Sequence, residues 1–150
     1  MGLIYLDSCL VIYAVEDDPV LGDRVLRAMS AEADVRFAVS PLVKLECLVK
    51  PMRTGDILLQ RRYEGALEQL VTLPITEPTF LAAAQLRARF GLRTSDALHL
   101  ACAQHHGCEV LWTNDDRLAR AGHGLARNVL GRRSGRAAAT SRSRAPGKPT

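Results

Sequence analysis

The sequence predicts an α/β fold, a three-layer α/β/α sandwich with a central, mainly parallel sheet. Short apolar runs alternate with stretches of helical periodicity, which is typical of strand–helix–strand units. The first run, residues 3–6, is continuously apolar, as expected of a central parallel strand that is covered on both faces. A hydrophobic content of 47% over 150 residues is sufficient for a core between the layers.

The order of elements follows from apolar spacing and from residues that begin or end helices. We expect strands over residues 3–6, 36–39, 71–75, 109–113 and 128–130. We expect helices over residues 9–15, 21–32, 41–50, 59–70, 77–90, 95–107 and 115–121. Ser8 and Ser40 are the expected N-caps of two of these helices. Pro51 is expected to stop the helix that begins at Pro41.

The charge is distributed unevenly along the chain. Of the 20 Lys and Arg residues, six lie after residue 130, where there is no acidic residue, so the net charge of +4 belongs to the C-terminal segment. That segment is rich in Gly, Ser, Ala, Arg and Pro and has no apolar periodicity. We therefore expect a folded domain over residues 1–130 and a basic, disordered tail over residues 131–150.

Two classes of protein are disfavoured by composition. No apolar stretch approaches the roughly 20 residues of a membrane span, and the N-terminus lacks a secretory pattern, so we expect a cytoplasmic protein. The four cysteines lack the paired spacing of a structural zinc site, and disulfides are not expected without secretion.

Two acidic residues are expected just beyond strand ends. Asp7 follows the first strand, and Asp115 follows the strand that ends at Thr113. Open α/β sheets place ligand crevices at the carboxyl ends of their strands. The ordinary alternative for each acid is a turn or helix cap, and Asp116 competes with Asp115 for either role.

Two further acids are expected on helix faces turned toward the sheet. Glu46 falls within the apolar stripe formed by Leu42, Leu45 and Val49. A carboxylate facing a core without a partner is costly, so Glu46 indicates a site, with a surface ion pair to Lys50 as the alternative.

Asp96 is the second acid expected on a helix face turned toward the sheet. It heads an arc with Leu100 and Ala103, although a carboxylate in the first turn of a helix is also favoured by the helix dipole.

Convergence of these four acids would require compensation of their charge. Two carboxylates about 4 Å apart repel by roughly 4 kcal/mol at an effective dielectric of about 20. Either some of them bind protons or a divalent cation neutralises them. Oxygen ligands without His or Cys suit Mg²⁺ or Mn²⁺, and such ions activate water and stabilise charge on a phosphoryl group. The pattern therefore favours a metal-dependent nuclease.

Four segments, in this order, resemble the acidic motifs of PIN domains. They are Leu6-Asp7-Ser8, the segment Ser40 to Glu46, Thr94-Ser95-Asp96-Ala97-Leu98-His99, and Thr113-Asn114-Asp115-Asp116. The short chain is similar to VapC-type toxins of bacterial toxin–antitoxin pairs. Cys9 departs from the family pattern, which often has a small polar residue there, and the residues after Asp115 lack the common second acid and aromatic.

The resemblance implies a PIN-like fold and a Mg²⁺- or Mn²⁺-dependent endoribonuclease. It further implies a homodimer that is restrained by a cognate VapB-type antitoxin. Metal-binding and catalytic roles fall on Asp7, Glu46, Asp96 and Asp115, and a supporting hydroxyl role falls on Thr113. Ser8 and Asp116 are further supporting candidates. The apolar helices near Leu10, Val11, Tyr13 and Leu48 are candidates for receiving an antitoxin segment.

Two arginines are candidates for RNA binding, and two alternative functions are compatible with the sequence. Arg93 and Arg117 lie close in sequence to the acids and are candidates for binding substrate phosphates, or else belong to solvated helix faces. One alternative function is a PIN-type nuclease of RNA processing or of single-stranded DNA, without an antitoxin. Another is a non-catalytic nucleic-acid-binding module.

Overall fold

The computed structural model describes residues 1–131, and the predicted basic tail lies outside the described residues except for Gly131. Its centre is a five-stranded, all-parallel sheet with the strand order β3-β2-β1-β4-β5. The strands are β1 (Gly2–Leu6), β2 (Val35–Val39), β3 (Val71–Thr72), β4 (Val110–Thr113) and β5 (Ala126–Asn128). The first strand is central, and its residues Ile4, Tyr5 and Leu6 are almost fully buried, which confirms its prediction from the apolar run.

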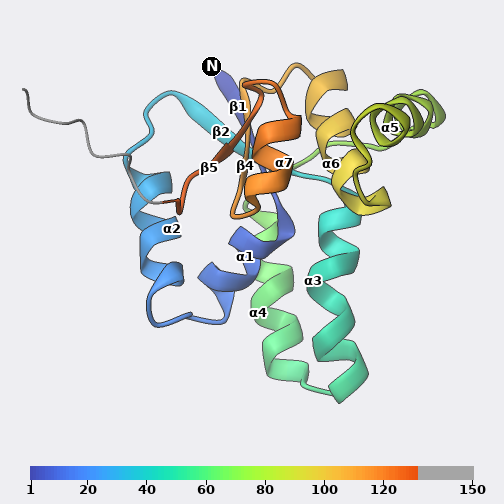
Figure 1. Cartoon of the computed structure of the whole chain (residues 1–150). Coiled ribbons are helices and arrows are strands. Elements are labelled where there is room, and N and C mark those ends of the chain that lie inside the picture. The colour runs from blue at the N-terminus through green and yellow to red at the C-terminus, as the bar shows by residue number, and fades with distance from the viewer. Residues whose placement is uncertain (132–150) are drawn as a thin grey trace, which may run out of the picture.

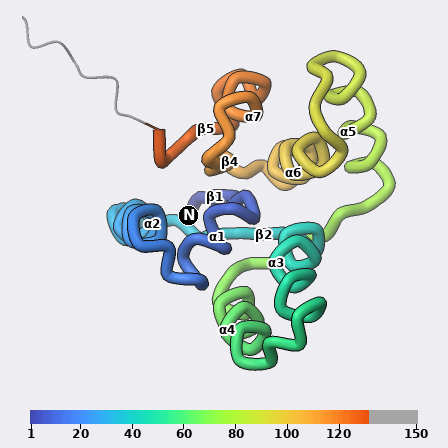
Figure 2. The backbone as a smooth tube through the Cα atoms, turned by 60° about the horizontal axis from the view of Figure 1, so that its bottom comes forward, coloured from blue at the N-terminus to red at the C-terminus, as the bar shows by residue number. Residues whose placement is uncertain are grey.

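Seven helices form two layers around this sheet within the described residues (Figures 1 and 2). One layer contains α1 (Ser8–Val15), α2 (Leu21–Ser30), α3 (Pro41–Thr54) and α4 (Ile57–Glu68). The opposite layer contains α5 (Glu77–Phe90), α6 (Thr94–His105) and α7 (Asp116–Ala121). The predicted three-layer α/β/α sandwich is therefore confirmed.

The change of layer creates a switch point between β1 and β4. From β1 the chain steps outward to β2 and β3, and it then returns through α5 and α6 to β4 on the other side of β1. Right-handed crossovers in opposite directions put their helices on opposite faces. The loops after β1 and β4 consequently diverge, and they leave room between them at the carboxyl ends of the strands.

Two sequence-based expectations about where helices begin and end were wrong. Asp7, not Ser8, caps α1, because its side chain accepts a hydrogen bond from the backbone N–H of Ser8. Pro51 does not end α3, which continues to Thr54 and stops at Gly55 in the left-handed conformation with φ +68°. Pro51 is buried, so its packing favours the helix despite the hydrogen bond that proline removes.

The apolar face of α3 was also placed incorrectly. Its buried residues are Val43, Cys47 and Pro51, whereas Leu45 and Val49 are 58% and 46% exposed. Residues spaced by four along a helix share a face, and those offset by two lie on the opposite side. Glu46 therefore lies at the border of the buried face.

Smaller differences concern the edge strands and the apolar residues of α1. The strand predicted over residues 128–130 is observed two residues earlier as β5, and β3 is shorter than the predicted 71–75. Leu10 and Val11 are core residues with 0% and 4% exposure, so they are not available to a partner. No helix among the described residues has the length and apolarity needed to span a membrane.

Candidate active site

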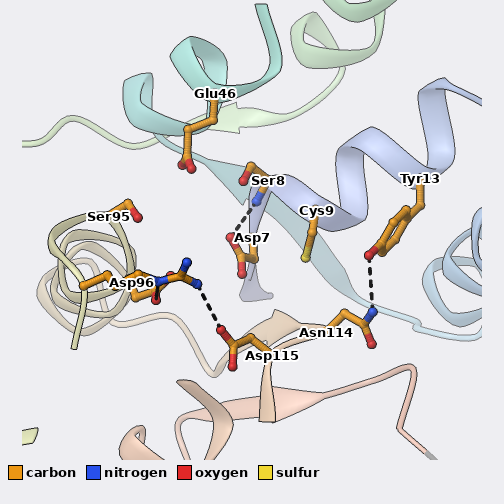
Figure 3. A pocket seen from close by; sticks show the side chains of 10 residues that line it. Asp7, Ser8, Cys9, Tyr13, Glu46, Ser95, Asp96, Asn114 and Asp115 are labelled. Atoms are coloured by element: carbon orange, nitrogen blue, oxygen red, sulfur yellow. Dashed lines mark hydrogen bonds and ion pairs between the residues drawn. The ribbon is translucent and has the colours of Figure 1, made fainter. Parts of the chain in front are cut away.

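A cavity of about 250 Å³ lies beyond the carboxyl ends of β1 and β4 (Figure 3). Its lining comes from α1, α3, α6 and the β4–α7 loop, which are distant in the sequence but meet at the switch point. The lining residues are Asp7, Ser8, Cys9, Tyr13, Glu46, Arg93, Ser95, Asp96, Asn114 and Asp115. All four carboxylates expected from the sequence therefore line one cavity.

Asp7 has the least exposed side chain of the four. It follows β1 and is 8% exposed. Its Oδ1 accepts from the Ser8 backbone N–H at 2.8 Å, and its Oδ2 accepts from the Thr113 hydroxyl at 2.7 Å. The Thr113 Oγ1 also accepts from the Asp115 backbone N–H at 3.0 Å. Thr113 thus connects the ends of β1 and β4 and sets the orientation of Asp7.

Asp115 combines the two roles considered from its sequence. Its Oδ1 caps α7 by accepting from the backbone N–H groups of Arg117 and Leu118. Its Oδ2 lies 3.5 Å from the Arg93 guanidinium, on the cavity side. The neighbouring Asp116 points elsewhere, because its Oδ1 accepts from the Asn128 side chain at 2.7 Å and it does not line the cavity.

Asp96 lies in the first turn of α6 and pairs with Arg93. The guanidinium Nε is 3.2 Å from Asp96 Oδ2, and the side chains of Arg93 and Asp96 are 69% and 15% exposed. Burial raises the pKa of the Asp96 carboxyl; Arg93 opposes this shift, and the charges of Asp7 and Asp115 add to it. Arg93 was a candidate for substrate phosphates, but it is engaged with two carboxylates here.

Glu46 reaches the cavity from α3 and is held by a residue that sequence reasoning did not select. His99 Nε2 lies 2.5 Å from Glu46 Oε1 and 3.7 Å from Asp7 Oδ1. His99 belongs to α6 and is 1% exposed. The only sequence signal for it was a histidine three residues after Asp96 in an otherwise apolar stretch, which also fits a core position.

The donor set fits a hard divalent cation by chemical type, since carboxylate oxygens are the ligands that Mg²⁺ and Mn²⁺ prefer. Burial raises the pKa of the Cys9 thiol to about 12, so this thiol is protonated at neutral pH and is a weak nucleophile. Within residues 1–131, however, no three His, Cys, Asp or Glu side chains lie close enough to form a preformed metal site. Arg93 forms ion pairs with Asp96 and Asp115 instead, and His99 forms a hydrogen bond with Glu46.

A second hollow of about 390 Å³ has the opposite character. It is lined by Phe90, Leu92, Arg117, Arg120, Ala121 and His123, with no acidic side chain among them. Leu92 and Arg117 of this hollow are close sequence neighbours of Arg93 and Asp115, which line the acidic cavity. A basic surface thus flanks the acidic cavity.

The chain is a parallel α/β protein with a cluster of carboxylates at the switch point of its sheet. Comparison with known families identifies which family of such proteins it belongs to. The chain belongs to the PIN domain family, whose model matches residues 4–124. A search of curated proteins found no match.

Solved structures share this fold at low sequence identity. A toxin–antitoxin complex from Klebsiella pneumoniae is 20% identical, with a TM-score of 0.70 over 84% of this chain and 97% of that chain. VapBC2 from Rickettsia felis, bound to a DNA fragment from its promoter, is 17% identical, with a TM-score of 0.72 over 84% and 98%. FitAcB from Neisseria gonorrhoeae is 23% identical, with a TM-score of 0.63 over 84% and 97%.

Proposed function

We propose that the chain is a metal-dependent endoribonuclease, the toxin of a VapBC-type toxin–antitoxin pair. The observation that carries the proposal is the gathering of Asp7, Glu46, Asp96 and Asp115 around one cavity at the switch point of a PIN fold. Four carboxylates in one small cavity favour the binding of a divalent cation and, through it, phosphodiester hydrolysis.

The four carboxylates are proposed to bind the metal ion and to place the attacking water. Asp7 and Asp96 would bind the principal Mg²⁺ or Mn²⁺ ion, and Asp115 would complete the site or bind a second ion. The ion would supply charge stabilisation at the phosphoryl group and acidify bound water. Glu46 would bind the ion or orient the attacking water from the α3 side of the cavity. Thr113 and the backbone N–H of Ser8 keep both Asp7 oxygens oriented.

Exposed apolar side chains support the proposed protein partners. Leu45, Val49 and Met52 of α3 and Phe80 and Leu81 of α5 are each 46–61% exposed. Exposed apolar patches of this kind mark protein interfaces. They suit a homodimer and an antitoxin segment better than Leu10 and Val11, which the core has already buried. The structural neighbours include toxin–antitoxin complexes, which agrees with an antitoxin partner.

Incubation of the purified chain with tRNA, rRNA and mRNA in Mn²⁺ or in EDTA tests the proposed activity. We expect new internal RNA ends in Mn²⁺ and intact RNA in EDTA, and a single-stranded DNA of matched sequence should resist cleavage. Cleavage that is equal in EDTA would contradict metal dependence. Preferential cleavage of the DNA would favour the alternative of a PIN-type DNA nuclease.

Arg117 and Arg120 are expected to bind the RNA backbone beside the acidic cavity. Both are exposed cations on α7 and line the second hollow. Replacing either by Ala should weaken the binding of single-stranded RNA. It should also reduce the slope of log K against log salt by about 0.7 for each lost phosphate contact. Fluorescence anisotropy in EDTA with the Asp96→Asn protein measures binding without cleavage.

Arg53→Ala provides the matched control, because Arg53 is exposed at the C-terminal end of α3, away from α7 (Figure 1). It should leave the affinity and the salt slope unchanged. If Arg53→Ala weakens RNA binding as much as Arg117→Ala does, the basic hollow has no special role.

A further inference from the structure

A buried chain of hydrogen bonds runs from the sheet to the acidic cavity. Ser40 Oγ lies 2.7 Å from the Tyr5 hydroxyl, and this hydroxyl lies 2.7 Å from His99 Nδ1. On the far side of the imidazole, Nε2 lies 2.5 Å from Glu46 Oε1. Ser40, Tyr5 and His99 are each at most 1% exposed. The chain joins β1, α3, α6 and the residue before α3, and it ends at a proposed metal ligand.

The chemistry of the partners determines the direction of these hydrogen bonds. An ionised carboxylate only accepts, so His99 Nε2 must carry a proton and donate to Glu46. In the neutral imidazole Nδ1 then accepts, so the Tyr5 hydroxyl donates to it and Ser40 donates to Tyr5. Burial raises the pKa of the Tyr5 hydroxyl above its usual range, so this donor keeps its proton. Every polar atom along this path then has a partner of the right kind.

The same Nε2–H also faces Asp7. Its distances to Glu46 Oε1 and Asp7 Oδ1 are 2.5 Å and 3.7 Å, so carboxylates from α3 and from the end of β1 are brought around one donor. Figure 3 shows the Glu46 side chain directed toward Asp7 and Ser8. Glu46 is on the border of the buried face of α3, and within the described residues His99 supplies its only side-chain hydrogen bond.

We propose that His99 is a positioning residue whose Nε2–H fixes the Glu46 carboxylate beside Asp7, while Tyr5 and Ser40 hold the imidazole in the required tautomer. This assignment rests on the proposed role of Glu46 as a metal ligand. Groups that hydrogen-bond to metal-binding carboxylates orient them, and their loss typically costs about 10- to 100-fold in metal affinity. His99 thus prepares one ligand of the cavity without touching substrate.

Mn²⁺ titration without RNA, together with ¹⁵N NMR of the histidine side chains, tests this proposal on the full chain. In the unaltered protein, His99 should carry its proton on Nε2. His99→Leu should weaken Mn²⁺ binding about 10- to 100-fold, and His99→Gln, which retains an amide donor, should recover part of the loss. Tyr5→Phe removes only the hydroxyl that donates to Nδ1 of His99. The proton of His99 should then no longer be confined to Nε2, and Mn²⁺ binding should weaken less than in His99→Leu. His105→Gln, at the exposed end of the same helix, is the control and should change nothing.

Two outcomes would overturn the proposal: a folded His99→Leu protein with unchanged Mn²⁺ affinity, or a proton on Nδ1 of His99 in the unaltered chain. If His99→Leu does not fold, Tyr5→Phe decides, because an unchanged tautomer and unchanged Mn²⁺ affinity would exclude the positioning chain. Failure of the proposed function has a different signature. In that case the unaltered protein would bind no Mn²⁺ and cleave no RNA, while the NMR measurement would still decide the state of His99.

Discussion

Asp96→Asn is expected to reduce RNA cleavage in Mn²⁺ by roughly 1,000-fold, since loss of a metal ligand removes several kcal/mol of transition-state stabilisation. Asp96 borders the cavity between Arg93 and the other carboxylates. Asn keeps the shape of the side chain but loses the charge that attracts the ion. Initial cleavage rates at saturating RNA, measured over a range of Mn²⁺ concentrations, test this expectation.

Asp116→Asn is the matched control for this substitution. Asp116 lies in the same motif and has the same side chain, but it pairs with Asn128 outside the cavity. Its replacement should leave the cleavage rate within about a factor of two, since it removes one exposed charge outside the cavity and the Asn oxygen can still accept from Asn128. Full activity of Asp96→Asn, or equal losses in both variants, would refute the assigned site.

The same Asp96→Asn substitution should stabilise the protein in EDTA at neutral pH. Burial raises the pKa of Asp96 above its unfolded value, so the native state binds more protons in the interval between the two pKa values. Stability of the unaltered chain therefore falls as pH rises through that interval, and Asn lacks this dependence. Urea unfolding in EDTA should give a higher midpoint for Asp96→Asn at pH 7, and the difference should shrink as pH is lowered toward 4. If Asp96→Asn is inactive but at least as stable as the unaltered chain, unfolding does not explain its loss of activity.

Thr113→Val is expected to lower the free energy of unfolding by about 2 kcal/mol, the scale of leaving buried polar groups without their hydrogen bonds. The Thr113 hydroxyl is fully buried, donates to Asp7 and accepts from the Asp115 backbone N–H. Valine preserves the volume but removes both hydrogen bonds at the point where β1 and β4 diverge. Because Asp7 also loses its orienting donor, Mn²⁺ affinity should fall about 10-fold or more. Urea unfolding and Mn²⁺ titration measure the two effects.

Thr113→Ser retains the hydroxyl and separates these effects from the loss of a methyl group. It should keep most of the Mn²⁺ affinity and lose about 1 kcal/mol or less of stability. If Thr113→Ser and Thr113→Val lower Mn²⁺ affinity equally, the hydroxyl does not orient Asp7, and packing alone explains the effect.

The layered fold could be predicted from the sequence because its signals are local. The apolar run of β1 requires cover on both faces, and the alternation of strands and helices favours a parallel sheet. Helix ends were predicted where the chain itself carries the signal, as at Gly91, which adopts φ +64° and ends α5. Pro51 was misleading because its local preference to end a helix was outweighed by packing against the rest of the layer.

The acids of the site could be predicted because a carboxylate after a buried strand, or on a helix near the core, requires an explanation. The reasoning for Glu46 was partly wrong, since Leu45 and Val49 are exposed and the true core face contains Val43 and Cys47. Glu46 still points to the cavity because it borders that face. The alternative considered for Glu46, an ion pair with Lys50, does not form, because Lys50 pairs with Glu16 instead.

By itself, the sequence determined the parallel α/β architecture, the two acids beyond strand ends and the two acids on helices, because apolar periodicity and carboxylates beside apolar segments are visible along the chain. Only the tertiary structure decided which groups bind these carboxylates. Arg93 forms ion pairs with Asp96 and Asp115, and hydrogen bonds join Thr113 to Asp7 and His99 to Glu46. These partners are up to 106 residues apart. Their pairing depends on the register of β1 with β4 and on the packing of α3 and α6 around them, which no local pattern of residues specifies.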